Sequence, residues 1–403
     1  MRLGATGLGV LLWGRGVSAL GDGLWFTTWA LFFTRVLELP LVVVGVGMAV
    51  AGAAGLLAAV PLGGLADRVD ARVVLAAVTA TRGLAMASYL VVDGTWSFLA
   101  ATVLFTAPAN GGNAVRTALI AALVPDTAAR VRALARQRVA QHVGYAIGAG
   151  LGALVLTADS PSAYALAITG NAVTFGVLAV TSLLVRTPPG PRRGTSRPVF
   201  RDRPYLAVVG VTSVLSLCWA MLSTGLPLWL SRSTDLPLAL GGVVVVVSSV
   251  GIAVFQVPFS RFARTPDQAA RTAVRSGLVL AASCVLLATT SGGAGAVGTA
   301  VVVAAAALHV VGELGYVAAN WGLSVTLMRE DARGAYQGVN EAATATVQLF
   351  GPAVFTFALG GFGAGGWLAA AAVFAAAVAP VPALTRWAVR TREPATSGSN
   401  SPP

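Results

Sequence analysis

The stretch from Leu41 to Arg72 reads LVVVGVGMAVAGAAGLLAAVPLGGLADRVDAR. Its first 26 residues, up to Ala66, carry no charge. About 20 helical residues cross the hydrocarbon core of a bilayer, which is roughly 30 Å thick. Inside that core every backbone polar group needs a partner, and an α-helix supplies those partners within one segment. The stretch therefore predicts a membrane-spanning helix that ends at a short polar turn beginning with Asp67.

The rest of the chain has a similar composition. Of its 403 residues, 56 % are hydrophobic and 10 % are charged, whereas a soluble domain carries roughly 25 % charge. The other apolar segments of spanning length are 8–34, 73–92, 96–124, 136–158, 162–185, 205–230, 238–262, 272–291, 295–327, 335–359 and 362–388. They are continuous and do not alternate as barrel strands do. We predict an all-α polytopic membrane protein with twelve transmembrane helices.

The arginines predict the orientation of these helices. All 27 basic residues are arginine, and 22 of them fall in segments that share one side of the membrane if the N-terminus is inside. The opposite loops hold only Arg35 and Arg232, and Arg15, Arg82 and Arg116 lie within spans. Cytoplasmic loops are enriched in basic residues. We therefore expect a multi-pass protein of a bacterial-type inner membrane with both termini cytoplasmic, and we do not take the +12 charge as a sign of nucleic-acid binding.

The longest polar stretch divides the chain into two halves. We predict two pseudo-symmetric six-helix bundles, residues 1–186 and 205–392, joined by a basic cytoplasmic linker at 187–204 and followed by a disordered tail at 393–403. A faint repeat at an offset of 203 residues agrees with this division, since Arg130 matches Arg333 and Gly148 matches Gly351. No phosphate-binding loop, metal cluster or nucleophile–base spacing is visible, so we expect no enzyme activity, no metal and no cofactor.

The turn after the quoted helix carries a family resemblance. From Gly63 to Arg72 it reads GGLADRVDAR, which resembles the signature loop of the major facilitator superfamily. Asp70 stands where that family usually has glycine, and Ala71 stands where it has a basic residue. The segment SALGDGLW at 18–25 further resembles drug–proton antiporters of the macrolide-efflux type. The resemblance implies a secondary transporter that works by alternating access.

The resemblance also implies a conformational gate in this loop. In the family the aspartate faces the start of the eleventh span, where a positive helix end stabilises a carboxylate by roughly 0.3–1 kcal/mol. The alternative is a loop whose charges only fix topology. Glu341 and Arg138 occupy equivalent positions of the repeat and are a second predicted gate pair. The predicted gate residues are Gly63, Asp67, Arg68, Arg72, Glu341 and Arg138.

Ionisable groups near the middle of spans indicate where protons move. Each costs at least about 2.5 kcal/mol at the bilayer centre, so it usually faces a partner or a wet cavity. Asp22 in the first span and Glu313 in the tenth lie near mid-depth, and His309 is one helical turn from Glu313. Either carboxylate is able to load and release a proton. The alternatives are an Asp22 paired structurally with an arginine and a Glu313 in an interhelical hydrogen bond.

Arg116 has two interpretations as well. In the family, an arginine in the fourth span is tied to proton coupling, but the residues that usually flank it are absent here. The alternative is that the Arg116 side chain extends to the cytoplasmic surface. We predict proton coupling through Asp22, Glu313, Arg116 and His309. The predicted substrate-cavity residues are Trp25, Trp29, Asn110, Asn113, Tyr316, Asn320 and Gln348.

The fifth span bears on the direction of transport. Residues 144–152 read GYAIGAGLG, which is close to the glycine-rich segment of exporters in the family, with Ala149 in the proline position. Glycines spaced by four also form a tight packing face in any helix bundle. We expect a monomer that exports amphipathic small molecules against inward proton movement. The alternative is an importer or facilitator of a polar nutrient such as a sugar.

Overall fold

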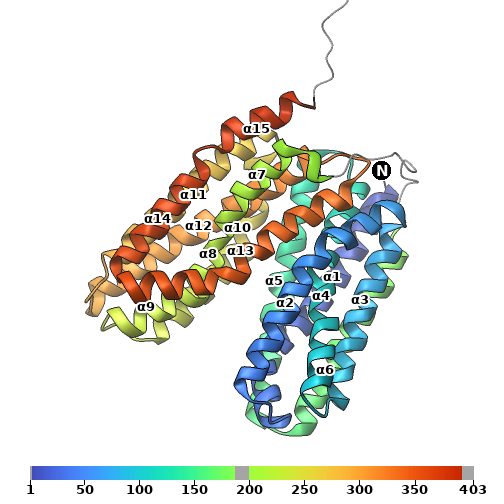
Figure 1. The fold of residues 1–403 in the computed structure, drawn as a ribbon, viewed down its shortest axis with the longest axis horizontal. Coiled ribbons are helices and arrows are strands. Elements are labelled where there is room, and N and C mark those ends of the chain that lie inside the picture. The colour runs from blue at the N-terminus through green and yellow to red at the C-terminus, as the bar shows by residue number, and fades with distance from the viewer. Residues whose placement is uncertain (1, 187–198, 393–403) are drawn as a thin grey trace, which may run out of the picture. The chain divides into compact units, whose positions relative to one another are not determined.

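The computed structural model describes residues 2–186 and 199–392, and these residues fold into helices joined by short turns (Figure 1). The segments proposed as linker and tail lie largely outside the described residues. The helices of the first half are α1 (Arg2–Leu31), α2 (Leu41–Arg68), α3 (Ala71–Ser88), α4 (Thr95–Leu123), α5 (Thr127–Ala158) and α6 (Pro161–Leu184). Each contains or closely matches one predicted segment.

The second half contains interrupted helices. The elements are α7 (Arg203–Ser213), α8 (Leu217–Ala220), α9 (Leu226–Ser233), α10 (Ala239–Phe259), α11 (Pro266–Ala288), α12 (Gly295–Leu327), α13 (Arg333–Phe362), α14 (Ala364–Val378) and α15 (Val381–Arg390). A π-helical turn, Met221–Gly225, joins α8 to α9. Pro382 lies in the first turn of α15, where a missing N–H does no harm.

Helices α5 and α11 begin well before their apolar segments because polar side chains cap them. Helix α5 begins at Thr127, nine residues before the predicted span, because the Asp126 carboxylate caps it by accepting the Ala129 N–H at 2.7 Å. Helix α11 begins at Pro266 because the Thr265 hydroxyl accepts the Gln268 N–H. Apolarity marks the part of a helix that faces lipid, whereas the caps mark where the helix starts.

Among the described helices, ten are long and apolar enough to cross a membrane. Helices α1 and α4 are not among these ten. Both carry polar side chains near their middle, Arg15 and Asp22 in α1 and Asn110, Asn113 and Arg116 in α4. These polar groups lower the hydropathy of the two helices and mark them as candidates for function.

The described residues form two compact units. One contains α1–α6 with residues 248–258 of α10 and 329–349, which include the start of α13. In it, α1 packs on α5 and α6, α2 on α4, and α3 on α4 and α6. The other contains α7–α9, α11, α12, α14, α15 and the rest of α10 and α13, with α11 packed on α12 and α14.

Glycines of α5 bring its backbone against α1. A Cβ added at Gly144 or Gly148 would collide with backbone atoms of α1, at Gly16 and Leu20 respectively. A Cβ at Gly152 would meet the Thr27 side chain at 2.7 Å. The exporter-like segment is therefore a close-packing face in this structure, which is one of its two interpretations.

Gly148→Ala is expected to destabilise the protein by about 1–3 kcal/mol, because overpacking forces the two helix backbones apart. Gly150→Ala on the same helix is the matched control, since no atom lies within 4 Å of a Cβ there. Thermal unfolding of the detergent-purified proteins measures both. Equal unfolding temperatures for the two variants would contradict the packing.

Candidate functional site

The carboxylate of Asp67, at the end of α2, binds the start of α13. Its two oxygens accept the backbone N–H groups of Gly334 and Ala335 at 2.7 and 2.8 Å. These donors belong to the first turn of α13, where the helix dipole is positive. Asp67 thus lies where the family resemblance implies, in contact with the predicted eleventh span.

Gly63 makes this approach possible. A Cβ at Gly63 would collide with the carbonyl oxygen of Gly334, and one at Gly338 would meet the Ala59 carbonyl oxygen at 2.7 Å. The two helices touch backbone to backbone, as small residues allow within a membrane. We call Gly63, Asp67, Gly334 and Ala335 the α2–α13 contact.

Glu330 adds an ion pair beside this contact. Arg130 Nη1 donates to Glu330 Oε1 at 2.7 Å, and Arg130 Nε donates to the Val124 carbonyl oxygen at 2.7 Å. Arg333 also pairs with Glu330. Burial opposes ionisation, but the hydrogen bonds from the two arginines outweigh it and hold the pKa of Glu330 below its usual value.

The lowered pKa of Glu330 determines the pH range over which its ion pairs with Arg130 and Arg333 stabilise the protein. The stabilisation is complete above the ordinary glutamate pKa and is lost only as the pH falls through the lowered value. Because the Glu330 side chain is 53 % exposed, we expect Glu330→Gln to cost less than about 1 kcal/mol. The difference in unfolding temperature between the two proteins should stay constant between pH ~6 and ~8, and a marked change over that range would contradict the assignment.

The other charges of the signature loop are engaged locally. Asp70 caps α3 by accepting the Arg72 N–H at 3.0 Å. The Arg72 side chain pairs with Asp70, which lowers the pKa of that carboxyl, and donates to the Val185 carbonyl oxygen at 2.8 Å. Arg68 is exposed. Asp70, which departs from the family pattern, therefore provides the helix cap and a partner for Arg72.

A buried ion-pair network occupies the first unit. Asp22 Oδ2 accepts from Arg15 Nη1 at 2.9 Å, and Asp22 Oδ1 lies 3.7 Å from Arg82 Nη2. Arg82 donates to the Phe105 carbonyl oxygen, and its guanidinium lies 4.7 and 4.5 Å from the ring centroids of Phe105 and Phe175. Asp22 is only 8 % exposed. Its structural pairing with Arg15 is thus present, and Arg82 is a partner that the sequence did not assign to the site.

Arg116 and Glu341 belong to a neighbouring cluster. Arg116 is 6 % exposed and donates to the amide oxygen of Asn113, so its side chain does not extend to the surface. The side chain of Glu341 is hydrogen-bonded to Asn113 and lies close to Arg116. Arg138, which we expected to pair with Glu341, is buried with its Nε 3.4 Å from His142 Nε2. Glu341 therefore contacts Asn113 and Arg116 of α4, and its pairing with Arg138 stays a prediction.

Glu313 has a different environment in the second unit. Trp219 Nε1 donates to Glu313 Oε1 at 2.8 Å, and His309 Nε2 lies 3.6 Å from Glu313 Oε2. The other imidazole nitrogen is 3.4 Å from the Met221 sulfur, next to the π-helical turn. Glu313 is 3 % exposed and His309 is fully buried. Widened helical turns often occur at functional sites.

Comparison with known proteins identifies the family of this chain. The sequence profile described as Major Facilitator Superfamily matches residues 11–352. The chain belongs to the major facilitator superfamily. None of the curated proteins compared with it matches significantly.

Solved structures of transporters share the fold. A bacterial homologue of the iron transporter ferroportin is 15 % identical, with a TM-score of 0.73 over 95 % of this chain and 99 % of that one. A human organic anion transporter is 13 % identical, with a TM-score of 0.69 over 94 % of this chain and 98 % of that one. The E. coli fucose:proton symporter is 12 % identical, with a TM-score of 0.67 over 96 % of this chain and 99 % of that one. At these identities the likeness shows the fold alone.

Within this superfamily member, the predicted cavity residues have different surroundings. Trp25 stacks on Tyr89 with ring centroids 5.1 Å apart, and Trp29 packs on Phe33 at 5.9 Å, so both belong to an aromatic cluster of the first unit. Tyr316 is buried with its ring edge-on to Trp219. Asn110 faces Gly55 of α2, Asn320 is half-buried and Gln348 is exposed.

Three contributors were missing from the predicted site, and each left a trace in the sequence. Arg82 stood out only as an arginine inside a span. Glu330 lies in the same short turn as Arg329, just before Arg333, and Trp219 is an aromatic residue inside the apolar segment 205–230. None of the three shares a helical stripe with its partner, so periodicity along a single helix does not find them.

Asp67→Asn should loosen the α2–α13 contact. A hydrogen bond to a charged group contributes about 1.5–3 kcal/mol, so amide exchange in the first turn of α13 is expected to quicken tenfold or more. Asp331→Asn is the control, because that carboxylate lies in the same turn and pairs with Arg329, whereas the Gly334 and Ala335 N–H groups donate to Asp67. Hydrogen–deuterium exchange of peptides covering 330–340 is the measurement. Equal exchange in both variants would contradict the capping role.

Proposed function

We propose that the protein is a proton-coupled secondary transporter that exports amphipathic small molecules, such as drugs or secondary metabolites, by alternating access. It would act as a monomer of twelve membrane spans, in two six-helix halves, in a bacterial-type inner membrane with both termini in the cytoplasm. Membership of a transporter family and ten apolar helices of spanning length support this proposal.

The observation that carries the coupling is the Glu313–His309 pair. Glu313 lies near the centre of the 33-residue helix α12, which supports a position near the middle of a span. The nearest atoms of the imidazole and the carboxylate lie 3.6 Å apart, so the two groups offer neighbouring sites for a proton that enters from water when access opens. Trp219 keeps the carboxylate in place in either protonation state, since its N–H donates to an oxygen.

We propose a different role for Asp22. Arg15 and Arg82 face the Asp22 carboxylate, and its negative charge compensates their positive charges within the first unit. This arrangement favours a permanent ion-pair network, with Glu313 and His309 as the proton-carrying pair. Arg116 and Glu341, joined through Asn113, form a second polar cluster whose charges change partners only if α4 and α13 move apart.

The α2–α13 contact is the proposed gate. Asp67 bridges two helices that belong to different halves of the sequence, and its bonds are made to backbone atoms that any movement of α13 would displace. The contact would form in one state of the cycle and break in another, with the Arg130–Glu330 pair acting beside it.

Two linked assays test the proposal. A drug-sensitive bacterial host carrying the gene is profiled against a panel of amphipathic antibiotics and dyes, with Glu313→Gln as control. In everted vesicles with a preformed proton gradient, each compound to which the gene gives resistance should dissipate the gradient when added, but only with the unmodified protein. Protection that does not depend on Glu313, or uptake of a sugar together with protons, would refute proton-coupled export.

A further inference from the structure

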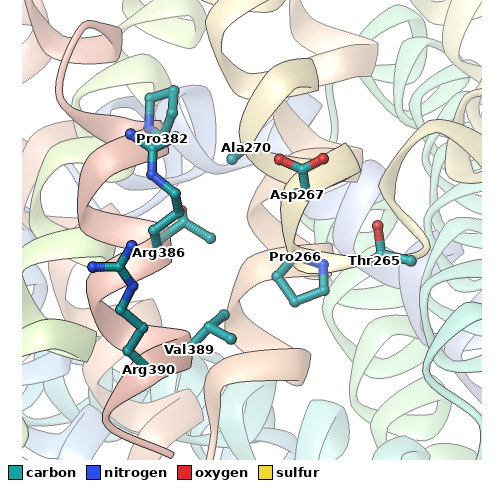
Figure 2. A pocket seen from close by; sticks show the side chains of 9 residues that line it. Thr265, Pro266, Asp267, Ala270, Pro382, Arg386, Val389 and Arg390 are labelled. Carbon is teal, nitrogen blue, oxygen red and sulfur yellow. The ribbon is translucent and has the colours of Figure 1, made fainter.

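A pocket lies between the start of α11 and the end of α15, apart from the groups proposed for transport. Its volume is about 400 Å³, within the range of small-molecule sites. Figure 2 shows α11 on one side and α15 on the other. The lining residues are Thr265, Pro266, Asp267, Ala270, Pro382, Thr385, Arg386, Val389 and Arg390.

The polar part of the lining is suited to an anion. Arg386 and Arg390 are one helical turn apart on α15 and are exposed. Helix α11 begins at the pocket, so its positive end adds to their charge. The one carboxylate in the lining, Asp267, is paired with Arg271. Two guanidinium groups therefore remain to face a negative ligand.

Thr385 is an independent sign of a missing partner. It is only 3 % exposed, it lines the pocket, and its hydroxyl oxygen has no hydrogen-bond partner within the described structure. A buried hydroxyl without a partner is unfavourable, because it loses its hydrogen bonds to water and gains none. A phosphate oxygen in the pocket would satisfy it.

The surroundings favour a lipid as the source of that phosphate. Trp387, beside Arg386, is 43 % exposed, and tryptophan is typical of the interface between membrane and water. Ala270, Pro382 and Val389 give the pocket an apolar part next to its charges. The arginine distribution places this end of α11 and α15 on the cytoplasmic side, where anionic lipids attract basic residues.

We propose that this pocket binds the headgroup phosphate of an anionic phospholipid of the cytoplasmic leaflet. Arg386 and Arg390 bind the phosphate oxygens, Thr385 donates its hydroxyl hydrogen to one of them, and the apolar lining receives the glycerol end of the acyl chains. The site is separate from the proposed proton pathway, so its failure would leave the proposed function intact.

Native mass spectrometry of the delipidated full-length protein tests the site with phosphatidylglycerol as probe. Each basic residue near a lipid surface contributes about 1 kcal/mol, so Arg386→Gln with Arg390→Gln should weaken binding roughly 10- to 30-fold. Arg264→Gln with Arg275→Gln removes the same charge from exposed positions of the same unit and should change binding by less than about threefold. Thr385→Val should weaken binding without any change of charge.

Phosphatidylcholine and glycerol phosphate are the comparison ligands. Both carry a phosphate, but the first lacks net negative charge and the second lacks acyl chains, so both should bind much more weakly than phosphatidylglycerol. Equal loss of binding in the two double-arginine variants, or equally tight binding of glycerol phosphate, would overturn the lipid site. Size-exclusion profiles and unfolding temperatures confirm that each variant is folded before its binding is compared.

Discussion

Glu313→Gln is expected to abolish proton-driven export while leaving a folded, membrane-inserted protein. Glutamine retains an oxygen that accepts the Trp219 N–H, so the stability should change by less than about 1 kcal/mol. It has no titratable proton, so the pair with His309 no longer loads or releases one. Export driven by an imposed pH gradient should fall to the level of liposomes without protein.

The matched control is a carboxylate with no proposed role in proton transfer. Asp331→Asn removes a charge from an exposed turn and should leave the coupled rate within a factor of about two. Exchange of substrate across the membrane without a gradient should persist in Glu313→Gln, because binding and alternation need no net proton movement. Full gradient-driven export by this variant would place the coupling elsewhere.

Asp22→Asn is expected to have the largest effect on stability. The substitution leaves the guanidinium groups of Arg15 and Arg82 buried without a compensating charge, and breaking a buried pair in this way costs about 3–5 kcal/mol. Thermal unfolding in detergent should show a large decrease in the unfolding temperature, together with a low yield of inserted protein.

Removing the opposite charge separates this effect from a loss of function. Arg15→Met combined with Asp22→Asn leaves only Arg82 uncompensated, so the double variant should be more stable than Asp22→Asn alone. If Asp22→Asn were instead as stable as the unmodified protein and deficient only in proton coupling, the structural role of Asp22 would be wrong.

The position of the helices follows directly from apolar run length, because lipid imposes the same requirement on every span. The largest differences are at helix starts such as Thr127, where a polar cap extends the helix beyond the apolar part. The signature loop was equally predictable from the sequence, since the spacing of its residues in GGLADR at 63–68 matches the family pattern. The contact of Asp67 with the start of α13 followed from the resemblance, not from composition.

The partners of the buried charges were harder to predict from the sequence. A helical stripe places Arg15 and Asp22 together on α1, but Arg82 reaches Asp22 from α3. Similarly, periodicity groups Glu313 with His309, whereas Trp219 comes from a position 94 residues away. Glu341 likewise contacts Asn113 and Arg116 of α4, which repeat symmetry did not indicate, and its pairing with Arg138 stays a prediction. Packing between helices decides such pairs, and a single sequence does not record it.

The most direct test of the account is a pH-difference infrared spectrum of the protein in lipid. Proton uptake by a buried carboxylate produces a carboxylic C=O stretching band that a carboxylate lacks. We predict a band that disappears in Glu313→Gln, shifts in His309→Gln and persists in Glu330→Gln. A spectrum in which Glu313→Gln leaves the band unchanged would contradict the central claim that Glu313 and His309 carry the proton.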